Sequence, residues 1–199
     1  MGNLTLVKGR ALVIVAHPDD ETIWMGGTIL ANPQVEWTIF SLCRADDTDR
    51  APKFRKVCRF LGARGAISDL DDEEVLSLRE SLPEIRRRIR RAIGSARFDY
   101  VFTHSYNGEY GHPRHRGVSR VAREMVRSGE IKTQALYNFS YEFDEGKNLC
   151  RPREEDVFVK LSPTLFRKKQ KVISEIYGFR KSTFEYMTLS KIEYFKSIK

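Results

Sequence analysis

The chain places its most apolar short run directly against a group of ionisable side chains, in the stretch ALVIVAHPDDE (residues 11–21). Residues 11–16 form a continuous apolar run of strand length, which is typical of a strand buried on both faces of a parallel sheet. The run leads into one histidine and three acids, His17, Asp19, Asp20 and Glu21. Carboxylates beside a buried strand repel one another and lose solvation, so we expect a bound group to offset their charge.

Strand-like and helix-like segments alternate along about 140 residues from this stretch onward, as in βαβ units. The predicted strands are residues 11–16, 35–42, 66–70, 98–104 and 133–143. The predicted helices are residues 21–32, 51–63, 81–94, 117–129 and 162–179. The alternation predicts an α/β protein with a Rossmann-like three-layer fold and a mainly parallel sheet. Neither a repeat nor a linker divides the sequence, so we expect a single domain over residues 1–199.

Residues 81–94 (SLPEIRRRIRRAIG) carry the densest positive charge. Ser81 and Glu84 match a capping box, which predicts that a helix begins at this point. The isoleucines recur every four residues and predict an apolar stripe, which leaves the arginines on the solvated side. This pattern favours an ordinary surface helix, and nucleic acid is therefore not an expected partner.

The amino-acid composition indicates the broad class of protein. The 199 residues are 41% hydrophobic and 31% charged with a formal net charge of +8, as in a folded globular protein. No run reaches the roughly 20 apolar residues of a membrane span, and no secretory signal is visible. Cys43, Cys58 and Cys150 are widely spaced and predict neither a disulfide framework nor a thiolate metal site. We expect a cytoplasmic location, and the sequence leaves a homo-oligomer open.

A second polar segment follows another predicted strand. HSYNGEYGHPRH (residues 104–115) comes after the apolar run DYVFT, as HPDDE comes after ALVIVA. The carboxyl ends of parallel strands lie at one edge of a sheet, so both segments should meet in one cleft. Imidazoles and a carboxylate that leave one coordination position open are typical of a catalytic zinc site. A divalent cation would also offset the crowded acids.

A structural reading of these residues is also available. A single histidine after a strand is commonly a hydrogen-bonded residue, and Asp19 and Asp20 could cap the following helix. Helix capping, however, needs neither His17 nor the second pair of histidines. The combination of the two segments therefore favours a metal site.

The motifs AHPDDE (residues 16–21) and YGHPRH (residues 110–115) resemble those of the PIG-L/LmbE-like zinc de-N-acetylases. That family includes N-acetylglucosaminyl-phosphatidylinositol deacetylase and the deacetylases of mycothiol and bacillithiol biosynthesis. Its second motif is usually H-P-D-H. The resemblance covers both motifs, their order and distance, and the strand–helix alternation, which is about the first two-thirds of the chain.

The resemblance implies a role for each matching residue. His17, Asp20 and His115 would be the metal ligands, with Zn²⁺ as the cofactor or another divalent cation in its place. Asp19 would be the general base that takes a proton from the metal-bound water and passes it to the leaving amine. His112 would stabilise the oxyanion or assist departure of the amine. Tyr110 and Arg50 would be substrate-binding residues.

The sequence departs from the family motif at Arg114, which stands where relatives carry an aspartate. In relatives that acid orients the first histidine and favours its protonated form, whereas a guanidinium disfavours an imidazolium. Three accounts are open. Another acid such as Glu109 orients His112, Arg114 points away to bind an acidic substrate, or catalysis is weakened.

The leading hypothesis is a zinc-dependent hydrolase that removes acetyl from an N-acetylated amino sugar or glycoconjugate. A second hypothesis keeps the metal and changes the substrate to another amide, such as a thiol conjugate. A third, motivated by Arg114 and the basic charge, is a non-catalytic binding protein that retains a degenerate site.

Overall fold

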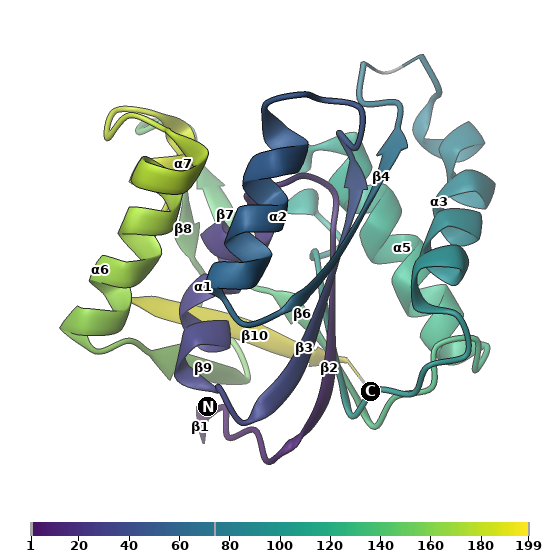
Figure 1. Cartoon of the computed structure of the whole chain (residues 1–199), viewed down its shortest axis with the longest axis horizontal. Coiled ribbons are helices and arrows are strands. Elements are labelled where there is room, and N and C mark those ends of the chain that lie inside the picture. The colour runs from purple at the N-terminus through teal and green to yellow at the C-terminus, as the bar shows by residue number, and fades with distance from the viewer. Residues whose placement is uncertain (1, 74, 199) are drawn as a thin grey trace.

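The computed structural model describes residues 2–73 and 75–198. One large sheet lies between two layers of helices, so the molecule has three layers (Figure 1). This arrangement confirms the predicted α/β fold with a mainly parallel sheet.

The sheet has eight strands in the order β1-β9-β10-β6-β5-β2-β3-β4. Five neighbouring strands run parallel, and they are β4 (Arg64–Leu70), β3 (Val35–Cys43), β2 (Gly9–Val15), β5 (Tyr100–Thr103) and β6 (Ala135–Phe139). The remaining strands are β10 (Ile192–Ile198), which is antiparallel to both of its neighbours, β9 (Val157–Lys160) and β1 (Gly2–Asn3). A separate antiparallel pair is β7 (Tyr141–Asp144) and β8 (Leu149–Pro152).

The helices fall into two groups on opposite faces of the sheet. The first group is α1 (Asp20–Ala31), α2 (Arg50–Phe60), α6 (Pro163–Lys171) and the π-helical segment η1 (Val172–Tyr177). The second is α3 (Leu78–Ile93) and α5 (Pro113–Arg127). Two one-turn helices, α4 (Gly108–Gly111) and α7 (Phe184–Met187), lie in connecting segments.

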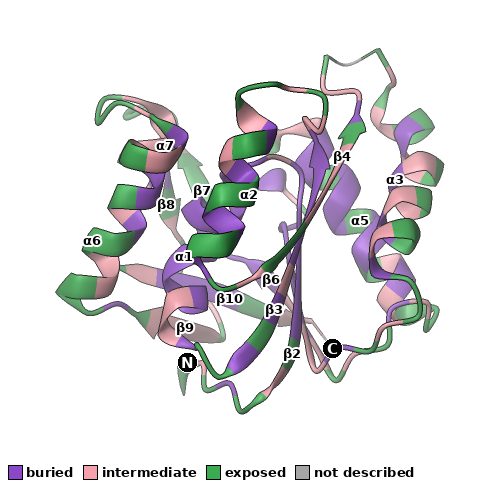
Figure 2. Ribbon diagram, in the orientation of Figure 1, coloured by how far each residue is buried: buried purple, intermediate pink, exposed green. Residues whose placement is uncertain are grey.

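Residues of β2 divide between the two faces because successive side chains of a strand point to opposite sides. Val13 and Val15 join a core with α1, α2 and η1, while Leu12 and Ile14 join a second core with α3 and α5. Figure 2 shows this central strand as buried along most of its length. A strand covered on both faces has no need for polar alternation, which explains the continuous apolar run.

The start of α3 differs from the prediction. The capping box consists of Ser77 and Glu80, so the helix begins at Leu78, and Pro83 lies inside it. Ser81 is buried within the helix instead of capping it, and its hydroxyl donates to the carbonyl of Leu78. The predicted apolar stripe is confirmed, because Ile85, Ile89 and Ile93 are all buried.

The C-terminal third contributes strands that the sequence did not predict. The predicted helix over residues 162–179 is present as α6 and η1, whereas β9 and β10 complete the sheet on either side of it. The three cysteines are free and buried. In the described part of the chain, no helix combines the length and the apolar character that a bilayer-spanning segment requires. The one-domain organisation remains a prediction.

Candidate active site

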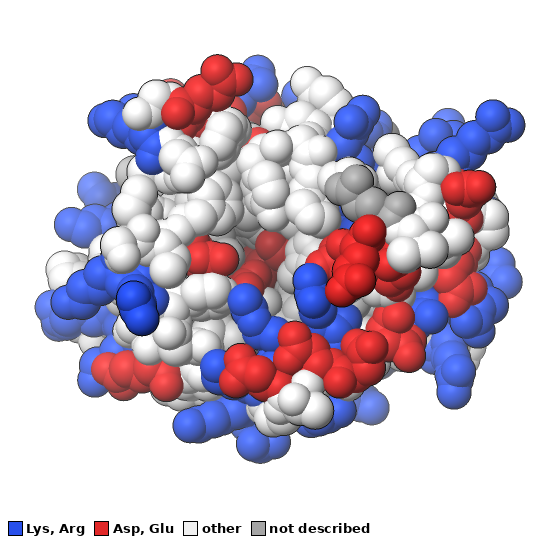
Figure 3. Space-filling view, turned by 90° about the horizontal axis from the view of Figure 1, so that it is seen from above, with Lys and Arg blue, Asp and Glu red and all other residues white. Residues whose placement is uncertain are grey.

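The candidate site lies at the carboxyl ends of β2 and β5, the two central strands of the parallel block. The chain leaves β2 toward β3 on one side and leaves β5 toward β6 on the other, so this is the switch point at which α/β proteins bind ligands. Seen from above, acids lie at the bottom of a hollow at this edge (Figure 3). The cavity measures about 290 Å³.

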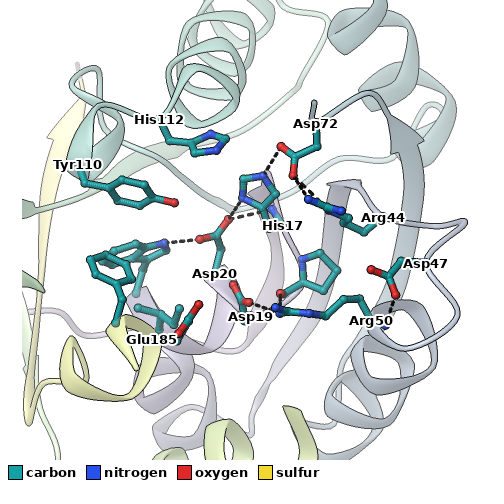
Figure 4. A pocket seen from close by; sticks show the side chains of 14 residues that line it. His17, Asp19, Asp20, Arg44, Asp47, Arg50, Asp72, Tyr110, His112 and Glu185 are labelled. Carbon is teal, nitrogen blue, oxygen red and sulfur yellow. Dashed lines mark hydrogen bonds and ion pairs between the residues drawn. The ribbon is translucent and has the colours of Figure 1, made fainter. Parts of the chain in front are cut away.

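Three of the predicted site residues converge on one point at the wall of the cavity. Figure 4 shows two of them, His17 and Asp20, and the third, His115, is fully buried behind them. His17 Nδ1 lies 3.3 Å from Asp20 Oδ2 and 3.2 Å from His115 Nε2. Asp20 Oδ2 and His115 Nε2 are 3.4 Å apart. Tetrahedral zinc with bonds of about 2.0–2.1 Å requires ligand atoms about 3.3 Å apart. The three atoms therefore have the spacing that a tetrahedral cation needs.

Other histidines near this point have their nitrogens engaged. His104 Nε2 accepts a hydrogen bond from the amide of Ala16 at 3.0 Å. His112 Nδ1 accepts from the amide of Arg114 at 3.2 Å. His104 can form a cluster with Asp20 and His115, and His112 one with His17 and His115, but only by giving up these bonds. The geometry therefore favours His17, Asp20 and His115 as the ligand set.

Two carboxylates orient the histidines of this set. Asp72 Oδ1 lies 2.8 Å from His17 Nε2, and Glu109 Oε2 lies 2.7 Å from His115 Nδ1. An ionised carboxylate only accepts, so these ring nitrogens carry the protons, and His17 Nδ1 and His115 Nε2 keep their lone pairs. Carboxylates placed in this way behind ligating histidines are usual at metal sites. Asp72 and Glu109 thus complete the support for the ligands.

The site stabilises a positive charge at the centre of the ligand set. Burial by itself lowers the pKa of His17, but its hydrogen bonds and charge interactions with Asp20 and Asp72 raise that pKa to about 10. The additional proton would occupy Nδ1, because Nε2 donates to Asp72. A bound dication would supply the same charge and displace this proton.

Asp19 lies beside the ligands without joining them. Its φ of 114° is rare for a residue with a side chain. The amide of Asp19 donates to Glu21 Oε2 at 3.0 Å, which holds the backbone in this conformation. Asp19 stands at the N-cap position of α1, yet its side chain makes no capping bond. The carboxylate therefore faces the cavity, and capping does not account for it.

Charge and burial act in opposite directions on Asp19. Burial, followed by the charge of Asp20, raises the pKa of Asp19 well above its usual range, and Arg50 opposes this effect. Arg50 lies 2.6 Å from Asp19 Oδ2 and packs over the ring of Phe179 at 4.6 Å. Arg50, expected to contact the sugar, is thus engaged with the predicted base.

The other predicted residues lie on the wall opposite Asp19. His112 is the N-cap of α5, so its Nδ1 accepts from the backbone and its Nε2 carries the proton of a neutral ring. Burial, with the neighbouring His115 and His17, lowers the pKa of His112 to about 4. Tyr110 is 37% exposed and stands at the mouth of the cavity beside Phe184. His112 is thus arranged as a neutral donor.

Arg114 points away from the cavity. It is 1% exposed, and its guanidinium donates to Asp71 Oδ2 at 2.7 Å and to the carbonyl of Leu76 at 3.0 Å. The segment that it holds carries Asp72, which orients His17. Glu109 contacts His115 and His104, so the account in which Glu109 orients His112 is wrong. Arg114 does point away, as the second account expects, but toward a segment of its own chain.

Sequence reasoning did not identify Asp72, Arg44 or Glu185, which also line the cavity. Arg44 pairs with Asp72 at 2.7 Å and adds a second cation to the wall. Asp72 belongs to the acidic run that follows β4, and that run was the one available signal. Glu185 comes from α7, a segment with no recognisable motif.

Comparisons with known proteins agree with this fold. The chain is similar to N,N′-diacetylchitobiose deacetylase from Pyrococcus horikoshii, with a TM-score of 0.68 and 19% identity over 95% of this chain and 83% of that one. It is similar to GalB, the 4-carboxy-2-hydroxymuconate hydratase of Pseudomonas putida KT2440, with a TM-score of 0.66 and 17% identity over 96% of both chains. The uncharacterized protein L374 of Acanthamoeba polyphaga mimivirus is 23% identical in an alignment 193 positions long that covers 88% of this chain and 78% of that protein.

The structural likenesses show the fold, and a fold can carry more than one chemistry, as a deacetylase and a hydratase illustrate here. The family is shown by a different comparison. The profile described as PIG-L, GlcNAc-PI de-N-acetylase, matches residues 12–126, a range that is more than half of the chain and holds both histidine motifs. The chain therefore belongs to the PIG-L family.

Proposed function

We propose that the protein is a metal-dependent de-N-acetylase that hydrolyses the acetamide of an N-acetylated amino sugar. The spacing of His17 Nδ1, Asp20 Oδ2 and His115 Nε2 is the observation that carries this proposal. Zn²⁺ is the cation we expect, because one carboxylate and two imidazoles with an open position suit it. A cation held by these three residues would polarise the acetamide carbonyl and lower the pKa of the attacking water.

Asp19 is the residue that moves the proton in this proposal. Its carboxylate accepts a proton from the attacking water and passes it to the amine as the carbon–nitrogen bond breaks, which yields acetate and a free amino sugar. Arg50, 2.6 Å away, favours the ionised form that can act as a base. Burial raises the pKa of Asp19 toward the range in which it can also return the proton.

His112 serves as a hydrogen-bond donor in this proposal. Its neutral Nε2–H lies on the cavity wall and can stabilise the carbonyl oxygen as negative charge develops on it. The bond from the Arg114 amide to Nδ1 excludes the doubly protonated ring unless that bond breaks. Of the two roles expected for His112, oxyanion stabilisation is therefore the one that its contacts support.

The substrate class follows from the lining of the cavity. Its volume of about 290 Å³ is near the lower end of small-molecule sites and suits one sugar unit. Arg44, Asp47 and Glu185 provide charged partners for hydroxyl groups, and Tyr110 stands at the mouth. The structural neighbours support the same class, since one of them is a deacetylase of N,N′-diacetylchitobiose.

The test combines two measurements on the purified chain. Elemental analysis after dialysis should give about one zinc or other divalent ion per chain, and amine release should follow incubation with N-acetylated sugars. If an amine is released only from amides other than N-acetylated sugars, the second hypothesis is favoured. Metal without turnover of any acetamide would contradict the proposal and favour a degenerate site. The cytoplasmic location and a homo-oligomer remain predictions.

A further inference from the structure

A second and larger hollow lies along α5, outside the candidate active site. It measures about 680 Å³, and β6 and β10 contribute Leu136 and Ile198 to its lining. We call it the α5 groove. Its charged residues are four arginines and one glutamate, namely Arg116, Arg120, Arg123, Arg127 and Glu124. A smaller hollow of about 240 Å³ shares Tyr106, Arg123 and Ile198 with it and adds Arg153 and Lys196, both of which pair with Glu155 in the same hollow. The two hollows therefore adjoin at Tyr106 and Arg123, and the unpaired positive charge belongs to the α5 groove.

Most arginines of the α5 groove have no acidic partner. In residues 2–73 and 75–198, Arg120 pairs with Glu124 at 3.0 Å, whereas Arg116, Arg123 and Arg127 form no ion pair. The arginine-rich α3 differs, because four of its arginines pair with acids, and they are Arg86, Arg87, Arg88 and Arg90. The groove thus concentrates positive charge that the described chain does not neutralise.

Ser119 provides an independent observation. It lines the groove, is only 1% exposed, and its hydroxyl finds no hydrogen-bond partner among the described residues. Ser119 is three residues after Arg116 and four before Arg123, so the three side chains share one face of α5. A buried hydroxyl without a partner costs free energy, which a polar ligand atom in the groove would recover.

We propose that the α5 groove binds a single-stranded nucleic acid, a partner that the sequence pattern of α3 did not lead us to expect. Arg116 and Arg127 are eleven residues apart, which places their backbones about 16 Å apart along the helix. An array of that length suits a linear polyanion better than one phosphate. Tyr106, 68% exposed at the junction of the two hollows, offers a ring on which a base can stack.

A flat membrane surface fits this region less well. Helices that lie on lipid expose several apolar side chains toward the acyl chains. In the α5 groove Leu136 is only 3% exposed, Leu78, Val126 and Ile198 are half-buried, and all four line a hollow instead of projecting from a flat face. The proposal is also independent of the proposed catalysis, because the catalytic cavity and the α5 groove have no lining residue in common.

The test is fluorescence anisotropy with the full chain and a labelled 20-nucleotide oligouridine, at 50 and 200 mM KCl. The variant Arg116→Gln/Arg123→Gln/Arg127→Gln should bind at least about tenfold more weakly at 50 mM KCl. The slope of log affinity against log salt should fall by about 2, because three phosphate contacts to a single strand are lost. Tyr106→Ala should weaken binding about fivefold or more.

The matched control removes the same charge from α3. Arg87→Gln/Arg90→Gln/Arg91→Gln should bind the oligonucleotide within about twofold of the unchanged chain, since its sites lie outside the groove. Equal weakening by both triple variants would show that net charge alone attracts the probe and would overturn the proposal. Absence of binding at 50 mM KCl would also overturn it, as would binding only to anionic phosphatidylserine vesicles. Circular dichroism melting of each variant confirms that it folds.

Discussion

Two buried clusters of charge hold α1, and they differ in whether the protein itself neutralises them. In the first, which we call the closed cluster, Glu193 accepts from the amides of Gly27 and Thr28, from the Thr28 hydroxyl, and from Lys169 at 2.6 Å. In the second, the open cluster, His17, Asp19, Asp20 and His115 lie at the other end of the same helix.

The difference between these clusters distinguishes a cluster that stabilises the fold from one that can bind a ligand. Every oxygen of Glu193 has a donor, and Lys169 supplies the opposite charge, so nothing further can bind there. In the open cluster His17, His115 and Asp20 converge on a point to which the described residues bring no cation other than the additional proton of His17 itself. A buried charge cluster whose groups are all paired within the protein indicates a structural role. A cluster whose ligand atoms converge without a partner indicates a binding site.

The largest effect is expected inside the open cluster. Asp19→Asn should reduce the turnover of an N-acetylated sugar by about 10²–10⁴-fold, because the amide cannot accept the proton. The metal content should stay unchanged, since Asp19 is outside the ligand set. Asp46→Asn, at a neighbouring exposed position, is the control and should keep full turnover. Full deacetylase activity in Asp19→Asn would remove the general-base role.

The closed cluster should respond in stability instead. Lys169→Met leaves the buried carboxylate of Glu193 without its cation, and we expect a loss of about 3–5 kcal/mol in the free energy of unfolding. Urea denaturation followed by circular dichroism measures this loss. Lys168→Met removes an exposed charge from the same helix and should change stability by less than about 0.5 kcal/mol. Equal stability of the two variants would contradict the comparison.

Asp72 tests the support behind the ligands. Asp72→Asn should weaken zinc binding by about 10–100-fold, because His17 loses the carboxylate that fixes its tautomer. Competition with a chromogenic chelator measures this affinity without any turnover. Glu73→Gln changes the adjacent exposed acid and should leave the affinity as it is. An unchanged affinity in Asp72→Asn would mean that the contact is incidental.

The smallest effect is expected at Arg114, which acts on His17 through the segment that carries Asp72. Arg114→Lys keeps the charge but cannot reproduce the two bonds to Asp71 and Leu76, so we expect zinc affinity to fall by less than about tenfold. The same chelator competition applies. A larger loss than in Asp72→Asn would show that Arg114 has a direct role.

Local sequence patterns predicted the parallel block and the two histidine segments because both depend on neighbours in the chain. The apolar run of β2 and the isoleucine stripe of α3 report burial directly. The order of strands then brings the two segments together, as predicted from their positions after β2 and β5.

Long-range pairings could not be predicted in this way. Asp72 reaches His17 across 55 residues, and Arg114 reaches Asp71 across 43, with no motif to mark either pair. The role of Glu109 depends on a backbone φ of 59°, which brings its carboxylate under His104 and His115. These pairs could be found only from the three-dimensional structure, because an aspartate, glutamate or arginine in the sequence could pair with many other residues of the chain.

The bond between Glu193 and the amide of Gly27 spans 166 residues. Tyr177 likewise reaches back to Glu21, beside the proposed base. During synthesis, the histidines and acids of the cavity emerge from the ribosome long before the strand that braces their helix. Assembly of the cavity must therefore be a late event in folding, and a polypeptide stopped after the second histidine motif would carry the chemical groups without the means to hold them in place.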